Sequence, residues 1–348
     1  MSKDLRHLTD LIYRGKLDRR GFITRATALG ASTAMASGLW TQASADAHAT
    51  PKKGGTIRLA TPGGATTDNF DPALAAETTA VVRLRHWGDP LVELAPTGGL
   101  EARIAESWEA SADAKTWTFK IREGVTFSNG KTLTPEDVMA TIERHAGEES
   151  KSGALGLLRD IASMKVDGQN FVVELKGGNA DLPYYFSDYH LMIQPNGGKD
   201  DPNAAIGTGA YTVAEFEHGV RYVYQKRDDY WGDLGNANTI EHLVINDDTA
   251  RVAAIQSGQV DLISRVPPKV ASLVNRAPNI DVRTSSGPGH YVFIMHTDTA
   301  PFDNNDLRLA LKYAMNRQEM VDKILFGFGS VGNDTPINAS YPLFSSEF

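Results

Sequence analysis

The 348-residue chain contains no cysteine. This absence excludes disulfide bonds, thiolate metal sites, cysteine nucleophiles and a lipid anchor on a cysteine at a cleavage site. The hydrolase motifs Gly-x-Ser-x-Gly and His-Glu-x-x-His are absent as well. Gly124 and Gly130 are separated by five residues, whereas a phosphate-binding loop places four between its glycines. Since no motif predicts catalysis, we expect a protein that is not an enzyme and needs no cofactor.

Positive charge is also scarce. The formal net charge is −8, and it falls to −11 without residues 1–49, which hold seven Lys or Arg and four Asp. This balance repels a phosphate backbone, so we expect no nucleic-acid partner. The apolar fraction of 41% is ordinary for a globular protein, and the length allows more than one domain.

The first 49 residues have the pattern of a targeting segment. Arg19 and Arg20 precede Phe22 and a mildly apolar run, 26–39, rich in Ala, Thr, Gly and Ser. The run is too short and too weakly apolar for a membrane span, which needs about 20 apolar residues. The segment resembles a twin-arginine export signal. It implies export to the periplasm by the twin-arginine machinery, with cleavage near Ala47 or Ala49.

The remaining chain mixes strand and helix patterns, which predicts an α/β fold. Alternating or β-branched runs predict the strands, and polar caps before amphipathic runs predict the helices. Thr134 and Asp137 are placed to form a capping box. The predicted strands are 56–60, 117–122, 171–175, 211–213 paired with 221–224, 240–245 and 260–263. The predicted helices start at Thr134, at Asp248 or Thr249, and near Asp306.

Histidine is too sparse to predict a metal centre. His290 and His296 are six residues apart and would share one face of a strand, but no carboxylate stands at ligand spacing. A histidine that lines a cleft, or one whose ring nitrogens are hydrogen-bonded in the core, fits this pattern better than a zinc ligand. We therefore expect no metal site.

Several short blocks occur in one order along the chain, and together they resemble family 5 of the bacterial extracellular solute-binding proteins. Ala210 stands where the family pattern Gly-Thr-Gly-Pro-Tyr has proline, and residues 227–232 are similar to its Asn-Pro-Asp-Tyr-Trp-Gly. The blocks are 104–109, 115–127, 130–131, 134–138, 207–211, 227–232, 251–262, 301–303 and 308–317.

The resemblance implies a two-lobed fold of the periplasmic-binding-protein type II class, with an inserted subdomain in the first lobe. It places the first lobe at 54–263, the inserted subdomain near 91–178 and the second lobe from 264. Family members continue well beyond the length of this chain. The resemblance therefore implies that the second lobe, 264–348, is incomplete and that the chain is truncated.

For function, the resemblance implies a monomeric periplasmic receptor that captures a ligand, expected to be a peptide, and delivers it to the permease of an ABC importer. Alternatives within the binding class are chelated nickel, haem or a sugar. A receptor that feeds a sensor or acts as a chaperone is the alternative outside transport.

The same resemblance places the loop after the first strand at the ligand cleft, together with a strand from the second lobe. For Asp68 and Asn69, plain turn chemistry is an equal alternative. His296 stands where the family often has asparagine. The candidate ligand-binding residues are Thr66, Thr67, Asp68, Asn69, Phe70, His290, Tyr291 and His296.

Overall fold

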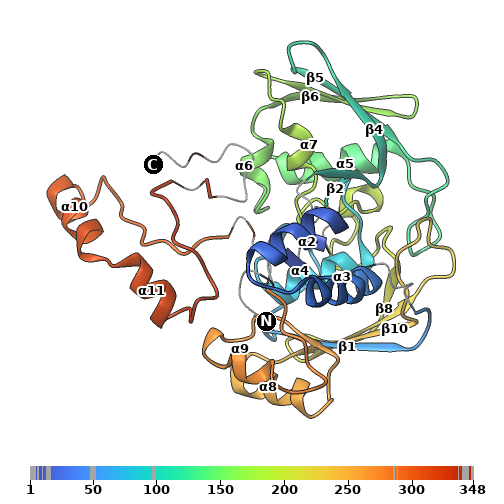
Figure 1. The fold of residues 1–348 in the computed structure, drawn as a ribbon. Helices are drawn as coiled ribbons and strands as arrows, with labels where there is room; N and C mark the ends of the chain where they lie inside the picture. The colour runs from blue at the N-terminus through green and yellow to red at the C-terminus, as the bar shows by residue number, and fades with distance from the viewer. Residues whose placement is uncertain are drawn as a thin grey trace. The chain divides into compact units, whose positions relative to one another are not determined.

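The computed structural model describes residues 5, 8–9, 11–12, 17–47, 52–95, 99–284, 287, 289–335, 337–338 and 345. The chain separates into two compact units, Met1–Val244 and Ile245–Phe348. Figure 1 shows their helices and strands.

Helices α2 and α3 precede the first sheet. Helix α2 spans Arg19–Ala28 and begins after Asp18, whose side chain accepts a hydrogen bond from the Gly21 N–H, and α3 spans Thr33–Ala47. The ring of Phe22 in α2 lies 6.0 Å from that of Trp40 in α3. Both helices fall within the segment that the sequence predicts to be an export signal. Among the described residues, no helix is long and apolar enough to cross a membrane.

The first unit contains one mixed sheet whose strands lie in the order β1, β10, β9, β8. Strand β1 pairs in parallel with β10, while β9 pairs antiparallel with both β10 and β8. Helix α4 packs on this sheet through Leu84 and Trp87, against Leu59, Tyr222 and Tyr224. The elements are β1 (Thr56–Thr61), β8 (Tyr211–Glu217), β9 (Arg221–Lys226), β10 (Thr239–Val244) and α4 (Thr78–Trp87).

An antiparallel sheet with the strand order β4, β5, β7, β6 forms a second layer of the first unit. On β5, Trp117, Phe119 and Ile121 alternate into the core, where they pack with residues of α5. The elements are β4 (Ala105–Ala110), β5 (Thr116–Ile121), β6 (Ile161–Asp167), β7 (Asn170–Leu175) and α5 (Pro135–Ala146). Shorter elements are η1 (Pro72–Leu74), β2 (Val92–Leu94), β3 (Leu100–Ala102), α6 (Leu155–Leu158), α7 (Leu182–Tyr185) and η2 (Pro195–Gly198).

The start of α5 confirms the capping box predicted from sequence. The Thr134 N–H donates to Asp137 Oδ2 over 3.0 Å, and Pro135 occupies the first helical position. Asp137 Oδ1 also pairs with Lys131 Nζ at 2.5 Å and accepts from the Asn196 N–H at 2.7 Å. One carboxylate therefore caps the helix and ties it to two neighbouring loops.

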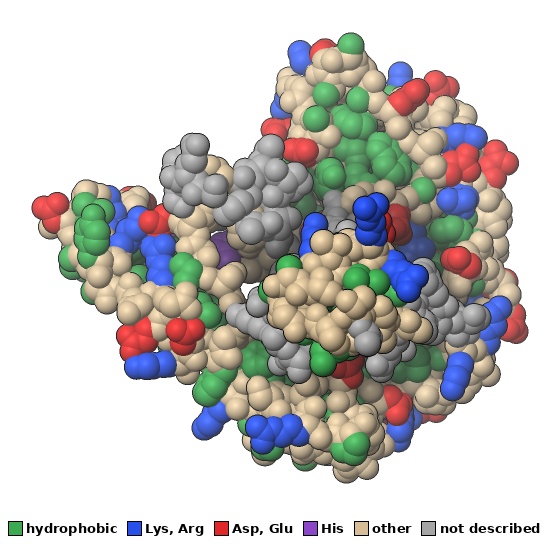
Figure 2. All heavy atoms as spheres, in the orientation of Figure 1, with side chains coloured by type: hydrophobic (Ala, Val, Ile, Leu, Met, Phe, Trp, Pro, Cys, Tyr) green, Lys and Arg blue, Asp and Glu red, His purple; other side chains and the backbone are tan. Residues whose placement is uncertain are grey.

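The second unit contains α8 (Asp248–Gln256), β11 (Leu262–Ile263), α9 (Pro268–Val274), α10 (Asn305–Ala314) and α11 (Arg317–Lys323). Asp247 caps α8, one residue before the first of the two predicted caps, because its side chain accepts from the Ala250 N–H. Arg251 is 1% exposed and donates to the carbonyls of Ile245, Ser264 and Arg265. Figure 2 shows acidic and basic side chains interspersed over the face in view.

Candidate ligand-binding site

Along the loop after β1, the side chains become progressively more buried. Thr66 and Thr67 are exposed, Asp68 and Asn69 are half-buried, and Phe70 is 3% exposed. The Asp68 N–H donates to the Ala65 carbonyl over 3.0 Å, so the loop turns at this point. Asn69 Oδ1 accepts from the Asp71 N–H over 3.0 Å, so the turn chemistry considered for Asn69 is present, and Thr66 and Thr67 stay exposed to solvent.

The buried side chain of Arg83, in α4, contacts this loop. Its guanidinium donates to the Asn69 carbonyl over 2.7 Å and to the Tyr222 hydroxyl over 2.7 Å, and it lies 3.5 Å from Asp68 Oδ2. Arg83 is 3% exposed, so water screens these contacts little. The cation thus fixes both the loop backbone and the direction of the Asp68 carboxylate.

Aromatic rings form one side of the loop. The Phe70 ring meets Phe216 edge-on at 5.1 Å, and it lies 5.3 Å from His218 and 5.9 Å from Tyr222. Phe216 is 56% exposed. Burial, and then the charge of Arg83, lower the pKa of His218. One exposed ring and a histidine biased toward its neutral form therefore pack against Phe70, at the end of the candidate loop.

The hairpin between β8 and β9 brings Phe216 and His218 close to the loop. Gly219 has a φ of +75°, and a Cβ at this position would lie 2.5 Å from the Ala65 carbonyl carbon. Only glycine suits both the backbone angle and the spacing. The sequence predicted the two strands and a glycine between them, but not that the turn supports the candidate loop.

A buried polar network lies beneath the loop, at the carboxyl end of β1. The Thr61 hydroxyl is 2.7 Å from the Thr79 hydroxyl and 2.6 Å from Nε2 of His242. Burial lowers the pKa of His242 to about 3, and it lowers the pKa of the neighbouring His86 to about 4. Both rings are therefore neutral at physiological pH, and the network positions the loop without adding charge to it.

The remaining sequence-predicted candidates lie in the second unit. His290, Tyr291 and His296 are exposed, with Tyr291 at 92%. Residues 289–296 are irregular here, so the strand on which the two histidines would share a face is not formed. A strand requires a hydrogen-bonded partner, and none of the sheets among the described residues includes this segment.

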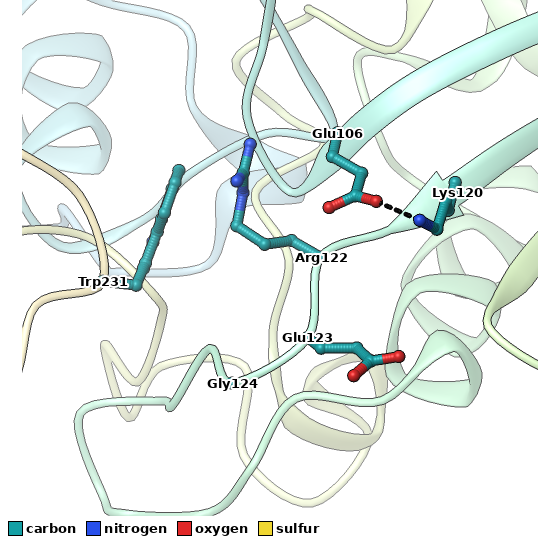
Figure 3. Close-up of a pocket in the computed structure, with 6 residues that line it drawn as sticks. All are labelled: Glu106, Lys120, Arg122, Glu123, Gly124 and Trp231. Atoms are coloured by element: carbon teal, nitrogen blue, oxygen red, sulfur yellow. Dashed lines mark ion pairs between the residues drawn. The ribbon is translucent and has the colours of Figure 1, made fainter.

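Among the described residues, the first unit has at least two cavities. One, of about 500 Å³, is lined by Glu106, Lys120, Arg122, Glu123, Gly124 and Trp231. Figure 3 shows Arg122 beside the face of Trp231, 4.8 Å from the ring centroid, and Glu106 paired with Lys120 at 2.5 Å. Its charges are largely matched and partly exposed. The other cavity, of about 570 Å³, lies near the start of β1.

A resident metal has no evident ligand set. Among the residues that the structure describes, no group of three or more His, Cys, Asp or Glu side chains is arranged to hold an ion. The features that can contact a solute at the loop are hydroxyls, one carboxylate and aromatic rings, which suits reversible binding of a polar molecule.

The chain is similar in sequence to curated binding proteins of bacteria. The chain is 27% identical over 273 residues to the nickel-binding periplasmic protein of Escherichia coli K12, covering 73% of this chain and 51% of the relative. It is 25% identical over 306 residues to the oligopeptide-binding protein OppA of Bacillus subtilis 168, covering 79% and 54%. The chain spans about half the length of these curated relatives.

Solved structures show the same fold. The periplasmic binding protein AgaA of A. tumefaciens R10, in complex with agropinic acid, superposes with a TM-score of 0.71 at 25% identity, over 84% of this chain and 60% of that one. DppA of Helicobacter pylori, in complex with the peptide STSA, gives 0.69 at 21%, over 79% and 59%. The mixed α/β structure is of the periplasmic-binding-protein type II class, as predicted.

The family model described as bacterial extracellular solute-binding proteins, family 5, matches residues 99–348. This range covers most of the chain and contains all of the blocks that carry the resemblance. The protein therefore belongs to family 5 of the bacterial extracellular solute-binding proteins.

Proposed function

We propose that the protein is the solute-binding component of an ABC importer, and that it captures a peptide, or a similar amine-bearing solute, in the periplasm for a membrane permease. The observation that carries the ligand class is the Asp68 carboxylate, oriented by Arg83, in a loop whose Phe70 packs against the exposed ring of Phe216. A carboxylate can accept hydrogen bonds from an ammonium group, and rings accommodate an apolar side chain.

The relatives allow other solutes. They include proteins named for binding nickel, haem and glutathione as well as oligopeptides. Glutathione is itself a short peptide, whereas nickel and haem are not amines. We favour the peptide because the loop supplies hydroxyls and a carboxylate. His290, Tyr291 and His296 remain candidates for further ligand contacts, and the lobe ranges 54–263 and 264–348 remain part of the proposal.

The ligand can be identified directly. The gene is expressed together with any coding sequence that continues after Phe348. The protein is purified from the periplasm and unfolded, and the released molecules are identified by mass spectrometry. Short peptides are the expected result. A sugar, haem or metal complex, with no binding of any peptide in calorimetric titration, would contradict the peptide assignment. Failure to bind any solute of these classes would contradict the receptor role.

Substitution of Asp68 by asparagine tests the carboxylate. We expect Asp68→Asn to weaken binding of the identified peptide by about tenfold or more, because a charge-assisted hydrogen bond is lost. Asp113→Asn is a matched control, since Asp113 is an exposed carboxylate in the turn before β5. Equal affinities for the two variants and the unmodified protein would exclude Asp68 from the site.

We also propose that residues 1–49 direct export by the twin-arginine route. Replacing Arg19 and Arg20 together by lysine should retain the protein in the cytoplasm at its uncleaved length, since the paired arginines are the recognised element. Fractionation and immunoblotting measure this outcome. Replacing Arg6 and Arg14 is the control with equal loss of arginine. Normal periplasmic delivery of the Arg19 and Arg20 variant would rule out this route.

A further inference from the structure

The end of the candidate loop is held by contacts that do not involve Arg83. The backbone N–H groups of Phe70 and Asp71 both donate to the side-chain oxygen of Asn203, each over 3.2 Å, and Asn203 lies 133 residues after Phe70. The Asp71 N–H shares its bond with Asn69 Oδ1, whereas within the described residues the Phe70 N–H has no other acceptor. Asn203 therefore supplies the hydrogen bond that fixes the backbone at Phe70.

The side-chain amide of Asn203 is itself held in one orientation. Two backbone donors meet its Oδ1 atom, and an amide nitrogen could accept neither bond, so the oxygen must face the loop. The Asn203 N–H donates to Asp201 Oδ1 over 2.9 Å, and the Ala204 N–H donates to the Asp201 carbonyl over 3.3 Å. Asn203 thus stands in a turn that its own neighbours close, with its side chain directed at the candidate loop.

The same turn and the same loop are also joined through α5. Arg144 pairs with Asp71 Oδ2 at 2.5 Å, and its Nη1 lies 3.5 Å from Gln194 Oε1. Gln194 is 1% exposed, and its amide donates to the Pro202 carbonyl over 3.2 Å. These contacts run from the loop through α5 to the residue before Asn203, and Asn203 is the member that returns to the backbone of the loop.

We propose that Asn203 is a positioning residue of the candidate site, which holds the loop in its ligand-binding conformation before a solute arrives. This role rests on the proposed function, because it takes the Asp68 loop as the place of binding. Arg83 fixes Asp68 and the Asn69 carbonyl, and Asn203 fixes Phe70, so the segment that carries the carboxylate is attached at both of its ends. A loop that is ordered in advance loses little conformational freedom on binding, which raises affinity.

Hydrogen exchange of the Phe70 amide in the solute-free chain measures the contact directly, by NMR on protein labelled at phenylalanine. Asn203→Leu removes the acceptor, and we expect the Phe70 amide to exchange faster by about fivefold or more. Asn203→Ala removes it with a smaller side chain, which guards against a folding defect of the leucine variant. Asn203→Asp keeps an oxygen acceptor and should keep the amide protected. Asn129→Leu is the matched control, since Asn129 is exposed and its Oδ1 accepts from the Lys131 N–H in another loop.

Calorimetric titration with trialanine measures the consequence for binding. Asn203→Leu and Asn203→Ala should each weaken binding of this peptide by about fivefold or more, and Asn203→Asp should stay within about twofold of the unmodified chain. Rescue by aspartate distinguishes positioning from direct contact with the peptide, because a contact made by the amide nitrogen would be lost in Asn203→Asp.

The proposal is overturned if the Phe70 amide exchanges at one rate in all variants, or if Asn203→Asp behaves like Asn203→Leu. It is also overturned if trialanine binds Asn203→Leu and Asn203→Ala as tightly as it binds the unmodified chain. Failure of trialanine to bind the unmodified chain counts against the peptide assignment instead, and the exchange rates of the Phe70 amide then decide the role of Asn203 alone.

Discussion

Lowering the pH from about 7 to about 5 is expected to destabilise the first unit strongly, because three histidines that are buried and neutral in the native state take up protons in this range only when the protein unfolds. Burial lowers the pKa of His86 and His145 to about 4 and that of His242 to about 3, from an ordinary value of 6.5. Nε2 of His86, Nε2 of His145 and Nδ1 of His242 are buried, with no hydrogen-bond partner among the described residues. The native protein therefore holds all three rings neutral.

The direction follows from proton linkage. A histidine with a depressed native pKa contributes stability above the unfolded value of 6.5, and that stability is lost as the pH falls toward the native value. Each such group gives a slope of about 1.4 kcal/mol per pH unit, so three give about 4 kcal/mol per unit. Asp89, with its raised pKa, acts in the opposite direction but is a single group. Domains are stable by only about 5 to 15 kcal/mol.

Urea unfolding followed by tryptophan fluorescence at a series of pH values measures this slope. Replacing His242 by glutamine removes one of the three groups and should reduce the slope by about one third. His296→Gln is the control, because His296 is exposed in the second unit. A free energy of unfolding that stays constant between pH 7 and pH 5, or the same slope in both variants, would contradict the assignment.

Replacing Arg227 by methionine is expected to lower the free energy of unfolding of the first unit by about 3 to 5 kcal/mol. The side chain is 3% exposed and connects the loop after β9 to two other segments that are distant in sequence. Its removal takes one donor from each of four carbonyl oxygens. Those of Phe127 and Gly207 keep a backbone N–H donor, and the other two lose the donor that Arg227 supplies. The acceptors are the carbonyls of Thr126, Phe127, Gly207 and Gly209, the Thr126 hydroxyl and the Asp229 carboxylate.

Arg221→Met provides the contrast. Arg221 also contacts two carboxylates, Glu215 at 3.1 Å and Glu241 at 2.6 Å, but its side chain is 42% exposed. Exposed ion pairs contribute about 0 to 1 kcal/mol, so this variant should remain within about 1 kcal/mol of the unmodified protein. Chemical denaturation of both variants at one pH gives the comparison. Equal losses would show that burial does not govern the role of Arg227.

Much of the local structure could be predicted from sequence, because it depends on neighbouring residues. The alternation at 117–122 marked β5, and Thr134 with Asp137 marked the start of α5. The aromatic residues Trp117 and Phe119 are in the core, as the pattern indicated. Strand 289–296 was predicted wrongly, since its residues fit a strand but its pairing depends on a partner elsewhere.

The support of the candidate loop could not be predicted. Arg83 reaches Asn69 across 14 residues and Tyr222 across 139, and Phe216 and His218 arrive from a hairpin far along the chain. Nothing in the pattern around Arg83 distinguished it from an exposed arginine on α4. The pairing of Arg85 and Arg103 with the single carboxylate of Glu93 was equally hidden, because it depends on how these side chains lie in the folded chain.

By itself, the sequence determined the absence of cysteine chemistry, the acidic balance, the positions of most strands and helix caps in the first unit, and the family to which the chain belongs. These properties depend on composition, on the hydrophobic periodicity of short segments and on the order of motifs along the chain, all of which can be read directly from the sequence. Only the tertiary structure decided which polar groups are buried, that Arg83 orients the Asp68 carboxylate, and where a second cavity opens. Those properties depend on contacts between distant segments, and burial alters the energy of every charge that it encloses.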